Sequence, residues 1–219
     1  MKQVSASFLS SDDIEKDISL LNETSVDFIH VDIMDGKFVQ NKTIPFRMMK
    51  NIYKFTSKRL DVHLMVEKPL KYIKKYATLN TEYITIHVEI EEDKEPLFDL
   101  INKYGIKKGL AINPDTSIEK IIPYLDQVDL ILVMSVYPGA GGQSFIEETK
   151  SKISALKKII KEKNLKTLIS VDGGINGETC KKIRSQVDIL VSGSYITNSD
   201  NFEESIKNLR GVKNGRKKI

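Results

Sequence analysis

The sequence lacks cysteine pairs and long hydrophobic runs. Its one cysteine, Cys180, cannot form an intramolecular disulfide or a zinc site of several cysteines, which is typical of a reducing cytoplasm. No run of roughly 18 apolar residues is present to span a bilayer, and the N-terminus lacks the pattern of a signal peptide. We therefore expect a cytoplasmic protein without a membrane partner, in which Cys180 is inert packing.

Charge of one sign is not concentrated along most of the chain. The 219 residues carry 34 Lys and Arg and 30 Asp and Glu, a net charge of +4, with lysines and acids interleaved on the predicted helices. This is typical of a solvated enzyme surface, whereas a nucleic-acid partner would need clustered basic and aromatic residues. Only residues 213–218 form a basic cluster. We expect residues 211–219 to be a frayed tail behind a catalytic domain of residues 1–210.

The chain alternates between short β-rich apolar runs and segments with helical periodicity. The predicted strands are residues 4–8, 26–33, 60–66, 83–88, 107–112, 128–133, 167–171 and 187–191. The predicted helices are residues 10–21, 46–55, 96–104, 146–163, 177–184 and 202–209, one that begins near Pro69, and one opened by a capping box, Thr116-x-x-Glu119.

Helical crossovers make consecutive strands parallel, and eight such units without a long linker predict a single-domain (β/α)8 TIM barrel. An open doubly wound sheet is the alternative. It is disfavoured because no Gly-x-Gly-x-x-Gly follows the first strand.

Histidine is scarce, yet all three histidines lie at or near the ends of predicted strands. His30, His63 and His87 fall there, as do Asp32 and Asp172. The carboxyl ends of the strands form the active-site face of such a barrel. Two histidines and two carboxylates converging there could hold one divalent cation, and Zn²⁺, Fe²⁺, Mn²⁺ and Co²⁺ all suit them. A single buried histidine would as readily be a hydrogen-bonded core residue, but the set favours a functional site.

Glycines gather after three of the predicted strands. Gly139, Ala140, Gly141 and Gly142 follow the sixth strand, Gly173 and Gly174 the seventh, and Gly193 and Ser194 the eighth. Exposed backbone N–H groups in glycine-rich loops bind anions, and barrels often bind phosphate at their last strands. Any one of these loops could be a plain flexible turn. Three of them around one side of the barrel favour a phosphorylated substrate.

Several segments resemble, in order, the signature motifs of the ribulose-phosphate 3-epimerase family. They are SASFLSSD, HVDIMDGKFVQN, DVHLMV, MSVYPGAGGQSF, SVDGGI and SGS, and the resemblance runs from residue 7 to residue 194. It implies one divalent metal ion, metal ligands at His30, Asp32, His63 and Asp172, and an acid/base pair at Asp32 and Asp172. It also implies a homo-oligomer. The implied substrate contacts are Ser7, His63, Gly139, Ala140, Gly141, Gly142, Asp172, Gly173, Gly174, Gly193 and Ser194.

The implied reaction inverts C3 of D-ribulose 5-phosphate to give D-xylulose 5-phosphate, as in the pentose phosphate pathway. Proton transfer at both faces of a flat cis-enediolate calls for two carboxylates, and a cation would stabilise its negative charge. Met34, Met65 and Met134 lie at three strand ends, where they could either line the pocket or belong to the ordinary core.

Four residues depart from the family's usual motifs. Lys37, Gln40 and Ala140 replace its usual His, Pro and Phe, and Ala6 replaces its opening Pro. D-allulose-6-phosphate 3-epimerases share most of these motifs and are the main alternative. Another phosphate-binding barrel lyase is a weaker one, because the Asp-x-Lys-x-x-Asp motif of orotidine- and hexulose-phosphate-type enzymes is absent.

Overall fold

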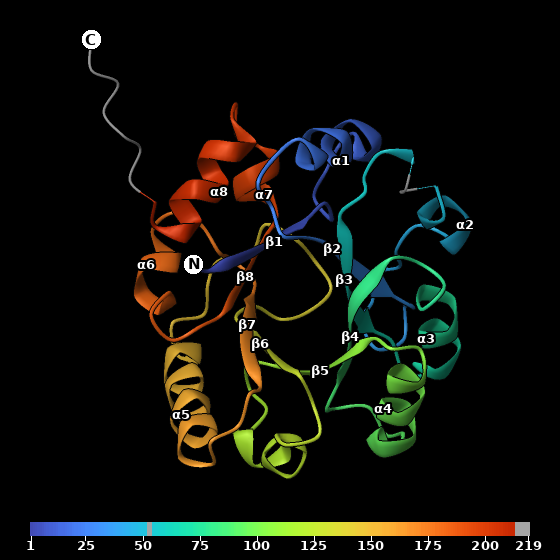
Figure 1. Ribbon diagram of the computed structural model, residues 1–219, viewed down its shortest axis with the longest axis vertical. Coiled ribbons are helices and arrows are strands. Elements are labelled where there is room, and N and C mark those ends of the chain that lie inside the picture. Colours follow the sequence, from blue (N-terminus) through green and yellow to red (C-terminus); the bar gives the residue numbers. More distant parts are fainter. Residues whose placement is uncertain (52–53, 213–219) are drawn as a thin grey trace.

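Eight parallel strands close into a barrel in this computed structural model, which describes residues 1–51 and 54–212 (Figure 1). Each strand pairs with the next one in the chain, and β8 pairs with β1 to close the ring. Helices surround the strands. The predicted single-domain (β/α)8 barrel is therefore confirmed. The basic cluster at residues 213–218 lies outside the described residues.

The elements follow one another in the expected alternation. The strands are β1 Gln3–Ser7, β2 Phe28–Met34, β3 Arg59–Met65, β4 Thr81–His87, β5 Lys107–Ile112, β6 Leu130–Met134, β7 Leu168–Asp172 and β8 Ile189–Ser192. The helices are α1 Ile14–Asn22, α2 Phe46–Met49, α3 Leu70–Tyr76, α4 Lys94–Lys103, α5 Thr149–Glu162, α6 Thr179–Ile183, α7 Ser194–Thr197 and α8 Phe202–Arg210. Among the described residues, none of these helices is long and apolar enough to cross a membrane.

The helix predicted from the capping box after β5 does not form. Two 3₁₀ turns, Ile118–Lys120 and Ile122–Tyr124, take its place, and no side chain caps the first of them. Pro123 explains this, because it has no N–H to donate and its ring would clash with the carbonyl of Glu119 in an α-helix. The prediction for residues 46–55 was also too long, since α2 ends at Met49. The short helix α7 was not predicted.

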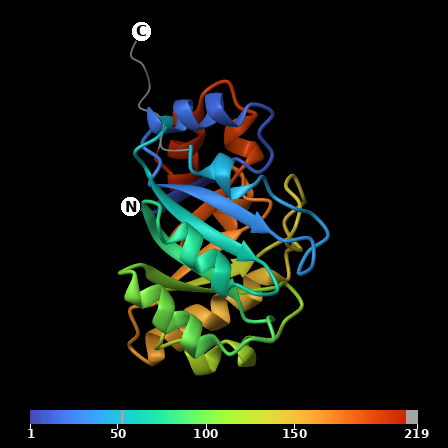
Figure 2. The same cartoon turned by 90° about the vertical axis from the view of Figure 1, so that its right-hand side faces the viewer.

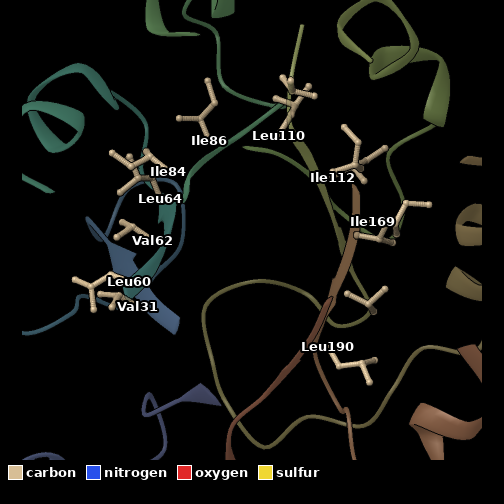
Figure 3. Packing of buried hydrophobic residues seen from close by; sticks show 14 of the residues in the cluster. Val31, Leu60, Val62, Leu64, Ile84, Ile86, Leu110, Ile112, Ile169 and Leu190 are labelled. Atoms are coloured by element: carbon tan, nitrogen blue, oxygen red, sulfur yellow. The ribbon is translucent and has the colours of Figure 1, made fainter. Parts of the chain in front are cut away.

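Alternate strand residues pack outward against the helices and form the main core. Figure 3 shows this layer of aliphatic side chains around the ring of strands. On β3, for example, Leu60, Val62 and Leu64 are fully buried in this layer. The residues between them on the strand must then point into the barrel, because side chains in a strand alternate faces. The register places Asp61 and His63 there.

The barrel interior is apolar at the amino ends of the strands and polar further along them. Phe28, Tyr83, Leu130 and Ile189 form a separate buried cluster at the amino ends of their strands, with Phe28 and Tyr83 meeting edge to face. The next positions along the strands carry polar side chains that are fully or almost fully buried: Ser5, His30, Asp61, Thr85 and Ser170. Burying polar groups costs free energy unless they find partners, so this layer indicates a function beyond packing.

The carboxyl ends of all strands lie at one end of the barrel. In Figure 2 the arrows point towards this end, where the loops after β2 and β6 project. These two loops meet, because the Asn41 side-chain amide donates a 2.6 Å hydrogen bond to the Gly139 carbonyl. The side chains at the strand ends are thus gathered under a shared set of loops.

Candidate active site

Four ionisable side chains converge at the carboxyl end of the barrel. His30 and Asp32 come from β2, His63 comes from β3 and Asp172 ends β7. One potential ligand atom of each lies within 4.8 Å of the others. The sequence-based prediction that these four residues belong together therefore agrees with their positions. The first three are buried, and the Asp172 side chain is 18% exposed.

His30 is held in place by a buried carboxylate on the neighbouring strand. Its Nδ1 lies 2.8 Å from Asp61 Oδ2, which also accepts a hydrogen bond from the Ser5 hydroxyl. This leaves Nε2 facing Asp32 Oδ1 at 3.3 Å and Asp172 Oδ2 at 3.8 Å. Nε2 is buried and has no hydrogen-bond partner. In metal sites, the ring nitrogen that does not bind the metal commonly donates a hydrogen bond to a carboxylate, which fixes the orientation of the ring.

His63 presents its other nitrogen to the same place. Its Nδ1 lies 3.1 Å from Asp32 Oδ1 and 3.9 Å from Asp172 Oδ2. Its Nε2 lies 2.8 Å from Nε2 of His87, and His87 Nδ1 lies 2.9 Å from Glu89 Oε2. Burial lowers the pKa of His87 to about 4, although Glu89 opposes the shift.

The pKa values of the two aspartates are shifted in opposite directions. Burial and, to a smaller extent, the neighbouring Asp32 charge together raise the pKa of Asp172 to about 7. Burial also opposes ionisation of Asp32, but His30 and His63 outweigh it and lower the Asp32 pKa. For His30, burial disfavours the charged form, yet Asp32 and Asp61 raise the pKa well above its usual value. Two carboxylates with separated pKa values suit a proton donor and a proton acceptor.

The donor set fits a divalent cation. It contains two imidazole nitrogens and two carboxylates, a set that suits Zn²⁺, Fe²⁺, Mn²⁺ or Co²⁺. The unpartnered Nε2 of His30 points at the centre of the cluster, where a cation would supply the missing interaction. The two carboxylates face each other near this point, and a positive charge would relieve their repulsion.

A pocket of about 600 Å³ opens beside this cluster. Among its lining residues are Ser7, Asp32, Met65, Met134, Gly139, Ala140, Gly141, Gly142, Asp172, Gly173, Gly174, Gly193 and Ser194. All the predicted substrate contacts except His63 therefore lie on one cavity. His63 is fully buried behind it, and Met34, which is 4% exposed, is not among the lining residues.

The glycines after β7 are required by the shape of this pocket. Gly173 has φ +115°, and a Cβ there would lie 2.4 Å from Val136 Cγ2. Gly174 has φ +61°, and its Cβ would lie 2.4 Å from the backbone nitrogen of Phe145. Only glycine allows the two strand ends to approach this closely. The loops after β6 and β7 thus pack against each other at the pocket wall.

Replacement of Gly173 by alanine is expected to lower the free energy of unfolding by about 3 kcal/mol or more, because backbone strain and a clash add. Gly142→Ala is the matched control. Gly142 also has a positive φ, of +73°, and lines the same pocket, but nothing lies within 4 Å of an added Cβ. It should cost only about 1 kcal/mol. Chemical denaturation of both variants measures the difference, and equal losses would contradict the packing argument.

A protein family and several named proteins match this chain over most of its length. The model of the ribulose-phosphate 3 epimerase family matches residues 3–197. The chain belongs to this family. Relatives named ribulose-phosphate 3-epimerase include one from Helicobacter pylori, 37% identical with 96% of this chain and 98% of the relative covered. Another, from Synechocystis, is 39% identical with 96% of this chain and 94% of the relative covered.

The fold is shared more widely than the family. A solved structure of a mutant tryptophan synthase alpha-subunit from Pyrococcus furiosus superposes with a TM-score of 0.69. It is 13% identical, with 96% of this chain and 98% of that chain covered. This likeness shows the barrel alone, and family membership is what makes the chain an epimerase.

Sequence reasoning missed the residues that support the cluster of this epimerase. Asp61 was assigned no role from the sequence, yet its carboxylate binds His30 on β2. Glu89 was not singled out, and its link to His63 through His87 depends on side-chain directions that strand ends do not reveal. The available signal was spacing, since Asp61 and His63, like His87 and Glu89, are two residues apart.

Proposed function

We propose that the chain is a metal-dependent epimerase that inverts C3 of D-ribulose 5-phosphate to give D-xylulose 5-phosphate, as in the pentose phosphate pathway. The observation that carries this proposal is the meeting of Asp32 and Asp172, from β2 and β7, with opposite pKa shifts beside one pocket. His30, Asp32, His63 and Asp172 would hold the divalent cation. When bound, the cation would polarise the ketone and stabilise developing negative charge.

The two aspartates would move the protons. Asp32, whose low pKa keeps it ionised, would take the C3 proton from one face of the substrate and leave a planar cis-enediolate. Asp172, whose raised pKa lets it carry a proton near neutral pH, would return one to the other face. The Ser7 hydroxyl donates to Asp32 Oδ2 at 2.9 Å and would hold this carboxylate in position. The roles would exchange in the reverse direction.

The glycine loops would bind the substrate phosphate. Gly174, which follows β7, and Gly193 and Ser194, which follow β8, line the pocket. Backbone N–H groups at such positions bind anions without introducing a charge that could interfere with the acid/base pair. The phosphate would then fix the distance from the anion site to C3, and the reacting carbon would sit beside Asp32 and Asp172.

Unphosphorylated D-ribulose is expected to be a poor substrate, because it lacks the anion that these loops would bind. Loss of two or three charge-assisted hydrogen bonds should lower kcat/KM on the order of 10³-fold. Steady-state kinetics with the two sugars measures the ratio. Comparable kcat/KM values would contradict the role of the glycine loops while leaving the acid/base pair untouched.

A side-by-side assay identifies the substrate. The purified, metal-analysed protein is given D-ribulose 5-phosphate and D-allulose 6-phosphate in coupled assays, and we expect the higher kcat/KM with the pentulose. The alternative, a D-allulose-6-phosphate 3-epimerase, depends on Ala140. This residue lines the pocket where the family usually has Phe, and its smaller side chain leaves more room for a longer sugar. A higher kcat/KM with allulose 6-phosphate would reassign the chain to that activity.

Zinc is expected to bind roughly 100-fold more tightly at pH 8 than at pH 6, because it would displace the one proton that the raised pKa of His30 retains. Asp172 and His30 both have raised pKa values, so the stability they give the metal-free fold is present at low pH. It is lost as the pH rises through about 7 for Asp172 and through the raised pKa of His30. Competition with a chelator at both pH values measures the change. A pH-independent affinity would contradict this.

We also propose that the chain forms a homo-oligomer, acts in the cytoplasm and has no nucleic-acid partner. Light scattering of the purified protein measures the oligomeric state. Filter binding to DNA and RNA over a range of salt concentrations tests for a nucleic-acid partner, since nucleic-acid binding would weaken steeply with salt.

A further inference from the structure

A buried chain of hydrogen-bonding groups leads away from the proposed metal ligands. It runs from His63 Nε2 to His87 Nε2, a distance of 2.8 Å, and from His87 Nδ1 to Glu89 Oε2, a distance of 2.9 Å. The two imidazole rings have centroids 5.0 Å apart and planes inclined by 27°, and both side chains are fully buried. Water therefore cannot replace the hydrogen bond between the two histidines.

Proton positions along this chain are coupled. A carboxylate can only accept, so an ionised Glu89 requires a hydrogen on His87 Nδ1. In neutral His87 the other nitrogen, Nε2, then has a lone pair and must accept. His63 Nε2 must donate to it and carries the hydrogen. His63 Nδ1 is consequently free of hydrogen, and this is the nitrogen that faces Asp32 and Asp172.

The far end of the chain is fixed as an acceptor. Glu89 Oε1 accepts a 2.8 Å hydrogen bond from the backbone N–H of Asn113, and the Thr116 hydroxyl also bonds to this carboxylate. Burial opposes ionisation of Glu89, yet these bonds and His87 lower its pKa to about 2. Lys152 holds the same loop by donating to the carbonyl of Asn113 at 2.6 Å. Phe38 packs on the His87 ring with centroids 4.6 Å apart.

We propose that Glu89 and His87 are positioning residues that fix the tautomer of His63, so that its Nδ1 presents a lone pair to the divalent cation. The inference rests on the proposed metal site. Each of the two proposed histidine ligands would then be oriented by a carboxylate, one directly and the other through a second imidazole. His30 is backed directly by Asp61, whereas His63 is backed by Glu89 through an intervening imidazole. Outer groups of this kind raise metal affinity by orienting the ligand.

The substitution Glu89→Gln tests the proposal because it reverses the polarity of the chain. An amide offers one acceptor where Glu89 offers two. With its oxygen kept on the Asn113 N–H, its NH₂ group would donate to His87 Nδ1. His87 Nε2 would then donate to His63 Nε2, and the hydrogen of His63 would move to Nδ1, facing the cation. The matched control is Glu91→Gln, the same charge change on an exposed residue of the same loop.

Zinc affinity, measured by competition with a chelator, should fall 10- to 100-fold in Glu89→Gln and stay unchanged in Glu91→Gln. The second readout is ¹⁵N NMR of histidine-labelled, zinc-loaded wild-type protein. It should show hydrogens on Nε2 of His63 and on Nδ1 of His87. Either a hydrogen on His63 Nδ1 or equal zinc affinity of Glu89→Gln and wild type would overturn the inference.

The wild-type measurement separates this inference from the proposed function. If the wild-type protein binds no zinc, manganese, iron or cobalt, the metal site itself is wrong and the positioning role falls with it. If the wild type binds zinc but its NMR spectrum shows the opposite tautomers, only the role of Glu89 and His87 is overturned. The NMR experiment needs no variant, so a Glu89→Gln protein that fails to fold does not prevent the test.

Discussion

Chelation of the divalent cation is expected to abolish turnover, with a loss on the order of 10³-fold or more, because nothing else would stabilise the developing negative charge. His30→Ala and His63→Ala should each lose the ion. Each removes one of two imidazole donors from a cluster whose ligand atoms lie within 4.8 Å of one another. Elemental analysis of dialysed protein, followed by the coupled assay, measures both effects.

Restoration is the control for this experiment. Addition of Zn²⁺, Mn²⁺, Fe²⁺ or Co²⁺ to the chelated wild type should return activity, and the most effective ion would identify the preferred metal. The same addition should not restore His30→Ala at comparable concentration. A preparation that is shown to be free of metal and is still fully active would contradict the metal site.

The strands were predictable from the sequence, whereas several helices were not. Each strand lies within two residues of its predicted bounds, since a buried barrel strand is a short β-rich apolar run whatever surrounds it. The helices depend more on local chemistry at their ends. At residues 116–124 the pattern of a capping box was present, but Pro123 prevents the helix that the pattern would open.

The first layer of the candidate site was predictable for a geometric reason. Every parallel strand of a barrel ends on the same face, so His30, Asp32, His63 and Asp172 had to approach one another once the strands were placed. The supporting layer was not predictable. Asp61 lies on β3, and whether its carboxylate bonds to a residue of β3 or of β2 depends on the His30 ring orientation and on packing across the barrel interior. The path from Glu89 to His63 likewise requires knowledge of two ring orientations.

Replacement of either aspartate of the proposed acid/base pair by asparagine should reduce kcat by roughly 10²- to 10⁴-fold, because the shape is kept while the proton acceptor is lost. Asp32 and Asp172 lie on β2 and β7, which are separated around the ring by β1 and β8. They can therefore approach a flat intermediate from different sides. Asp126→Asn, on an exposed residue, is the control for the loss of one negative charge. Bound metal must be measured in each variant, since both residues are also proposed ligands.

Exchange in deuterated water distinguishes the two aspartates. In metal-loaded Asp172→Asn, Asp32 should still remove the C3 proton of D-ribulose 5-phosphate and return a deuteron to the same face. The substrate should therefore gain deuterium without being inverted. NMR of the recovered sugar measures the isotope, and the coupled assay measures D-xylulose 5-phosphate. Inversion at a near-normal rate in this variant would rule out Asp172 as the second acid/base group, because protonation at the opposite face would then need no carboxylate there.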